Sequence, residues 1–145
     1  MALGLSASPV LLALGVSLTF LTLAAPIQFT AYRITMSWAL EAAALTWIGA
    51  RVKNAYMTYA GVVIFVLVLI RLLAIDALIY PSATGHAPIL NQRFVTFVLS
   101  AACLWLAAYW LRPTPLALFH YFAGHVVLLW TLTQEVLDWA PRGSD

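Results

Sequence analysis

Charged side chains lie inside long apolar stretches of this sequence, and they are the first candidates for chemistry. The stretch Tyr56–Tyr80 is long enough to cross a membrane as one helix, yet it contains Arg71 and Asp76. A charge near the centre of such a helix costs about 2.5 to 3.5 kcal/mol, so both side chains should face protein rather than lipid. Glu41, in the preceding apolar stretch, has the same requirement. Buried charges of this kind form ion pairs that fix helix packing, or they line a path for protons or solutes.

Depth in the membrane predicts which of these charges meet. If the chain crosses five times, Glu41 lies roughly 9 Å, Arg71 roughly 13 Å and Asp76 roughly 6 Å from one membrane surface, at 1.5 Å per residue. We therefore expect an ion pair between Glu41 and Arg71. Asp76 should then face Arg33 or Arg93 at the surface.

The expected intramembrane polar network contains five side chains. They are Glu41, Arg71, Asp76, Asn91 and Arg93. Glu135 and Asp138 fall on the same side of the membrane as Asn91. One interpretation is an ion network that holds the helices together. The other is a polar pocket, or a proton or solute path, that opens to this side.

His120 and His125 are the candidate cofactor ligands. They are five residues apart, which places their side chains about 140° apart around a helix. They therefore cannot share a metal as an i, i+4 pair would. Gly124, one turn after His120, would leave room for a flat macrocycle, which makes pigment or haem contact a hypothesis. A hydrogen bond to a neighbouring helix is the more common role for such a histidine.

No familiar catalytic motif accompanies these residues. The sequence contains no G-x-S-x-G, HExxH, CxxC or phosphate loop, so we expect no catalytic residue, no metal site and no enzyme activity. The single Cys103 excludes an internal disulfide.

Composition places the chain in a membrane. Of its 145 residues 64% are hydrophobic and 8% are charged, and the mean hydropathy is +0.97. Soluble domains contain about 25% charged residues, so this is an integral membrane protein with the lipid bilayer as its first partner. The net charge of +2 includes no basic block, which gives nucleic-acid binding no support.

The apolar stretches predict an all-α integral membrane bundle of about five transmembrane helices, forming a single domain over residues 1–145. The expected spans are residues 9–25, 35–52, 56–80, 94–111 and 116–139. Tyrosines and tryptophans near the span ends match the aromatic belt of membrane interfaces. The second span is too polar to stand alone in lipid. Its small residues Ala42, Thr46 and Ala50 recur every four positions, which favours close helix packing.

The distribution of positive charge gives an orientation. The N-terminal side of the membrane, here side A, carries Arg51, Lys53 and Arg112, and the opposite side B carries Arg33, Arg93 and Arg142. If the acidic residues on side B neutralise Arg33 and Arg93, the free positive charge is on side A. This favours a cytoplasmic N-terminus.

Several polar residues match, in order, a block found in large bacterial multi-pass membrane proteins. The matching positions are Pro26, Gln28, Trp38, Ala39, Leu40, Glu41, Ala42, Gly49 and Arg51, followed by Arg71, Leu72, Leu73 and Asp76 and by Leu90–Phe94. The chain resembles the C-terminal portion of this predicted family, whose function is unknown. The resemblance implies a topology and a shared polar residue set, and it implies no activity. We expect the chain to lie in a bacterial inner membrane.

The leading functional hypothesis is a non-enzymatic accessory or structural subunit that packs against other membrane-protein subunits. An energy-converting or photosynthetic assembly would suit it, with His120 or His125 touching a pigment or haem. The alternative is a small transporter or channel-like protein that uses the polar network. A water-accessible cavity reaching Glu41 and Arg71 would favour this alternative.

Overall fold

The computed structural model describes residues 32–76 and 91–139, together with seven earlier residues. These seven are Ala13, Val16, Ser17, Phe20, Thr22, Ala24 and Ile27, and each is helical. Apart from short connections the two long ranges are helical throughout, and they contain no strand. The all-α prediction is therefore confirmed for this part of the chain. The expected span over residues 9–25 lies largely outside the described residues.

Five helical elements follow one another in the described ranges 32–76 and 91–139. They are α2 (Tyr32–Val52), α3 (Ala55–Ile70), the π-helix η1 (Arg71–Asp76), α4 (Gln92–Trp110) and α5 (Pro115–Trp139). Three stretches are long and apolar enough to cross a membrane, namely 55–75, 92–110 and 115–139. Helix α2 has 21 residues but is not one of these three. The described residues thus support three membrane spans, fewer than the expected five.

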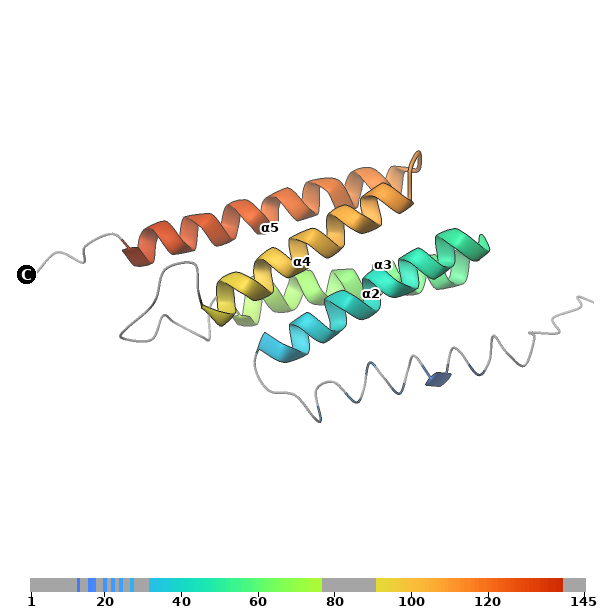
Figure 1. The fold of residues 1–145 in the computed structure, drawn as a ribbon, viewed down its shortest axis with the longest axis horizontal. Helices are drawn as coiled ribbons and strands as arrows, with labels where there is room; N and C mark the ends of the chain where they lie inside the picture. Colours follow the sequence, from blue (N-terminus) through green and yellow to red (C-terminus); the bar gives the residue numbers. More distant parts are fainter. Residues whose placement is uncertain are drawn as a thin grey trace, which may run out of the picture.

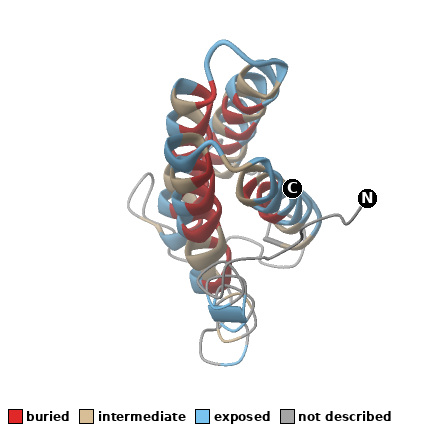
Figure 2. Cartoon of the chain, turned by 90° about the vertical axis from the view of Figure 1, so that its right-hand side faces the viewer, coloured by how far each residue is buried: buried red, intermediate tan, exposed pale blue. Residues whose placement is uncertain are grey.

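The helices form two hairpins that meet through one pair of helices. Helix α2 packs on α3, α4 packs on α5, and α2 packs on α4 (Figure 1). The buried positions form stripes on the faces where the helices meet (Figure 2). Phe65 of α3 also reaches α5, where its ring lies edge-on to His120 with 5.1 Å between the ring centroids.

A two-residue connection sets the register of the first hairpin. Gly61 lies six residues after the start of α3, and a Cβ on it would collide with Thr46, which lies six residues before the end of α2. Gly49 and Thr58 are the matching pair three residues from the turn, where a Cβ on Gly49 would lie 2.6 Å from Thr58 N. Both glycines let the two backbones approach closely. A residue of α2 and a residue of α3 that are equally far from the turn therefore lie beside each other.

The connection itself combines the end of one helix with the start of the next. Lys53 has a positive φ of 53°, and the Asn54 amide donates to the Gly49 carbonyl oxygen over 2.9 Å. This pattern is a Schellman motif, which satisfies the last carbonyl groups of α2. The Asn54 side chain then accepts from the Tyr56 amide at 3.0 Å and caps the start of α3.

Candidate functional site

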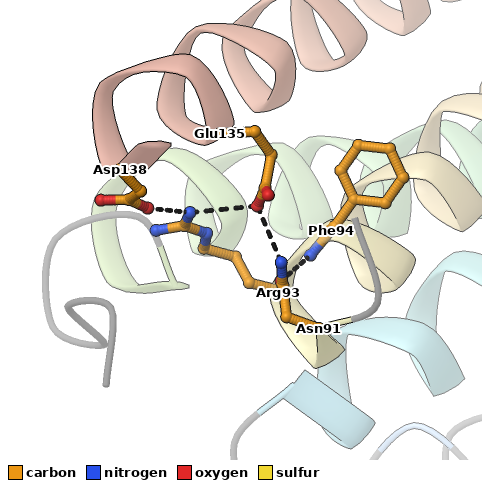
Figure 3. A network of polar contacts seen from close by, with 5 residues as sticks. All are labelled: Asn91, Arg93, Phe94, Glu135 and Asp138. Atoms are coloured by element: carbon orange, nitrogen blue, oxygen red, sulfur yellow. Dashed lines mark hydrogen bonds and ion pairs between the residues drawn. The ribbon is translucent and has the colours of Figure 1, made fainter. Parts of the chain in front are cut away.

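Four polar side chains join the start of α4 to the end of α5. This α4–α5 polar cluster consists of Asn91, Arg93, Glu135 and Asp138 (Figure 3). Arg93 Nη2 donates to Glu135 Oε1 at 3.2 Å and also to Asp138 Oδ2. Asn91 Nδ2 donates to the same Glu135 oxygen at 2.9 Å. One guanidinium therefore contacts two carboxylates.

The cluster is nearly closed to solvent. The side chains of Arg93 and Glu135 are each 9% exposed, and that of Asp138 is 12% exposed. Both carboxylates lie in the last turns of α5, where the negative end of the helix dipole disfavours them. The cation from α4 offsets this effect, so the cluster stabilises contact between the two helices.

Local sequence positions each member of the cluster. Asn91 is the N-cap of α4, and its Oδ1 accepts from the Phe94 amide at 2.7 Å while its Nδ2 faces α5. Glu135 and Asp138 are three residues apart, which places them on one face of α5. The sequence predicted that these two acidic residues share a side with Asn91, but it did not include them in the network. Their i, i+3 spacing opposite Arg93 is the signal that identifies them.

Glu41 belongs to a separate contact. Its residue is 6% exposed, and its Oε1 accepts a hydrogen bond from the Thr22 hydroxyl. Trp38, on the same helix, donates its indole N–H to the Thr22 carbonyl oxygen at 3.0 Å. Thr22 therefore contacts both Glu41 and Trp38 of α2, and no feature of the sequence indicated Thr22 as the partner of Glu41.

Arg71 contacts a different part of α2. Its Nε donates to Thr35 Oγ1 at 2.9 Å, and Thr35 is fully buried. Thr35 lies six residues from Glu41, or roughly 9 Å along the helix axis. The structure gives no ion pair between Glu41 and Arg71, although it describes both residues. The predicted pair is thus replaced by two contacts at different depths.

The remaining expectations for the network concern Asp76. This residue ends η1, and its side chain lies outside the described part of the chain. Its expected partner Arg93 is occupied by Glu135 and Asp138. Of the five predicted side chains, the structure brings together Asn91 and Arg93, while the described contacts of Glu41 and Arg71 lie elsewhere.

His120 is completely buried between aromatic rings. Its Nδ1 lies 2.7 Å from the Leu116 carbonyl oxygen, and since a carbonyl only accepts, Nδ1 carries the proton. Phe65 and Phe119 stand edge-on to the imidazole. Within the residues that the structure describes, Nε2 has no hydrogen-bond partner. In the neutral tautomer with the proton on Nδ1, Nε2 is the acceptor nitrogen.

The space next to His120 does not suit a macrocycle. A Cβ on Gly124 would lie 2.6 Å from Trp105 Nε1, so the indole of Trp105 already fills the gap that this glycine leaves. The prediction of room for a flat cofactor at this position is wrong. The glycine instead allows Trp105 to approach α5, and the residues present do not fit a haem or pigment between Gly124 and α4.

His125 also makes its contacts within the α4–α5 hairpin. Its Nδ1 lies 2.8 Å from the Tyr121 carbonyl oxygen and 3.2 Å from Trp105 Nε1. A carbonyl only accepts and an indole N–H only donates, so Nδ1 can serve one of them at a time. Among the described residues no group of three or more His, Cys, Asp or Glu side chains could hold a metal ion.

Comparison of the chain with protein-family models, with curated proteins and with solved structures gave no match. The contacts described above are consequently the basis for assigning a role to the site.

Proposed function

We propose that this chain is a non-enzymatic integral membrane protein that serves as a structural subunit of a larger membrane assembly. The observation that best supports a structural role is the α4–α5 polar cluster. Its charged groups lie in a nearly closed space, and each carboxylate already contacts Arg93. A cluster of this kind fixes two helices together and leaves little surface for a substrate.

The surface that would meet other subunits is on α5. This helix packs on α4 along one side and exposes large apolar side chains at helical spacing along the other. They are Leu118, Phe122, Val126, Leu129 and Val136, each more than half exposed, and we name them the α5 stripe. Thr133 beside the stripe bonds back to the Leu129 carbonyl oxygen, so it presents no unsatisfied hydroxyl. The stripe suits a neighbouring apolar helix.

The polarity of α2 is not an argument for an external partner. Helices α3 and α4 and the Thr22 segment cover its polar positions within the chain itself. The proposed contact with a partner is therefore assigned to α5.

Gentle extraction from the native membrane, with particle mass and visible absorption recorded together, tests the proposal. We expect a particle that contains other protein chains. The variant Leu129→Trp in the α5 stripe should release this chain from the particle. Val63→Trp should not, because Val63 is equally exposed but lies on α3. A particle of one or a few copies of this chain alone would refute the structural-subunit proposal.

A second candidate function, a small transporter, is supported by Glu41. This carboxylate is buried and accepts from a neutral hydroxyl, and among the described residues no cation pairs with it as Arg93 pairs with Glu135. Buried acidic residues without a cation are typical of proton-coupled carriers. Reconstituted vesicles carrying wild type or Glu41→Gln test this candidate. A proton flux that the substitution abolishes would support it, and equal passive leakage in both would exclude it.

A further inference from the structure

A cleft of about 320 Å³ lies at the end of the bundle where both hairpins turn. The connections 53–54 and 111–114 line it together with the first residues of α3 and α5. Figure 1 shows both turns at the same end of the molecule. Since α4 and α5 are each long enough to cross a membrane, their connection lies at a membrane surface.

The cleft is lined by two cations. Lys53 comes from one turn and Arg112 from the other. Thr58 and Thr114 also line it, and their hydroxyls already donate to the carbonyl oxygens of Asn54 and Leu111. No Asp or Glu among the described residues lines the cleft. The ends of α2 and α4 reach the cleft as well as the starts of α3 and α5, so the helix dipoles oppose one another there and the positive charge comes from Lys53 and Arg112. The cleft is therefore suited to an anion.

The backbone at Lys53 decides which substitution can test its charge. Its φ of 53° lies in the left-handed region, where Schellman turns usually have glycine or asparagine. A lysine there is disfavoured by its own Cβ, whereas asparagine adopts this conformation more readily. Asparagine is therefore the replacement that removes the charge and keeps the turn.

Aromatic side chains place the cleft at headgroup level. Trp110 and Tyr59 line it, and such residues prefer the boundary between lipid headgroups and acyl chains. We propose that the cleft binds the phosphate headgroup of an anionic phospholipid, with Lys53 and Arg112 as the cationic contacts. Because each cation belongs to a different hairpin, the bound phosphate links the two hairpins.

Titration of the protein in a neutral detergent with dioctanoyl-phosphatidylglycerol tests the proposal by calorimetry. Loss of one cation should weaken binding about fivefold, and Lys53→Asn combined with Arg112→Gln about 25-fold. Asparagine tolerates a positive φ, so Lys53→Asn should keep or increase the unfolding stability while binding falls. Loss of stability and binding together in this variant would indicate a structural role for Lys53 and contradict the proposal.

Arg51→Gln is the matched control, because Arg51 is exposed near the same turn but does not line the cleft. Its affinity should stay within twofold of wild type. An equal loss in all three single variants would show a diffuse attraction to positive surface and overturn the site. Dioctanoyl-phosphatidylcholine should bind at least tenfold more weakly than the anionic lipid. Binding of inorganic phosphate as tight as that of the lipid would assign the cleft to a free anion and refute the lipid proposal.

Discussion

Replacement of Arg93 by glutamine should strongly destabilise the contact between α4 and α5. The substitution removes the cation that both Glu135 and Asp138 contact, and it leaves the two carboxylates next to each other and about nine-tenths buried. Removing one partner of a buried ion pair costs about 3 to 5 kcal/mol. Glu135 is four residues from the end of α5, or roughly 6 Å, so water reaches the site more easily than a mid-membrane one. We therefore expect a loss of about 3 kcal/mol, the lower limit of that range.

Reversible unfolding by dodecyl sulfate in mixed micelles, followed by circular dichroism, measures this loss. The folding equilibrium constant should fall by roughly two orders of magnitude. Arg33→Gln is the matched control, because Arg33 is an exposed arginine in the first turn of α2. It should change stability by less than about 0.5 kcal/mol. Arg93→Lys should recover part of the loss, since an ammonium supplies charge but lacks the planar guanidinium.

Neutralising the whole cluster distinguishes the cost of unpaired charge from the loss of packing. In the triple variant Arg93→Met, Glu135→Gln and Asp138→Asn no charge remains buried, so most of the lost stability should return. A value for Arg93→Gln within about 0.5 kcal/mol of wild type would refute the assignment of these contacts as a stabilising network. If the triple variant were as unstable as Arg93→Gln, the loss of unfolding stability would instead come from lost packing.

Three further predictions use the same unfolding assay or a labelling assay. Gly61→Ala should cost about 1 to 3 kcal/mol, because the new Cβ would collide with Thr46, while the exposed neighbour Ala60 should tolerate leucine within about 0.5 kcal/mol. Thr22→Val should cost about 1 to 3 kcal/mol by removing the hydroxyl donor of a buried carboxylate, and an unchanged midpoint would argue against that contact. Cys103 is 3% exposed and should react with a maleimide only when dodecyl sulfate unfolds the protein; rapid labelling in mild detergent would contradict its burial.

The helices were predictable from the sequence because apolar runs and their interruptions are local features. The predicted span 94–111 corresponds to α4 at Gln92–Trp110, and 116–139 corresponds to α5 at Pro115–Trp139. The Arg112–Pro115 break separates them, and Pro115 is acceptable as the first helical residue because it needs no amide donor. The membrane assignment rests on the same local composition.

The occupancy of small gaps was not predictable in this way. Gly124 leaves space on α5, and the sequence alone does not reveal which side chain of another helix enters it. Trp105 does so, which turned a possible cofactor gap into a packing contact. Thr22 could not be predicted as the partner of Glu41 either. Hydrogen bonds between helices depend on how each helix is rotated about its axis, and the sequence alone does not determine this rotation.

The error in pairing Glu41 with Arg71 arose from where depth was counted. The depths of Glu41 and Arg71 were counted in residues from the far ends of two predicted spans, so the uncertainty of both span ends entered the result. The tight turn at Lys53 instead fixes directly which residues of α2 and α3 lie beside each other. Arg71 lies sixteen residues after the start of α3, so it is level with Met36, sixteen residues before the end of α2. Thr35 is adjacent to that level and receives the hydrogen bond from Arg71. The contact also brings the guanidinium closer to the end of the helix, the direction in which long cationic side chains extend toward water. In a membrane hairpin with a two-residue connection, partners are therefore best predicted by counting outward from the turn.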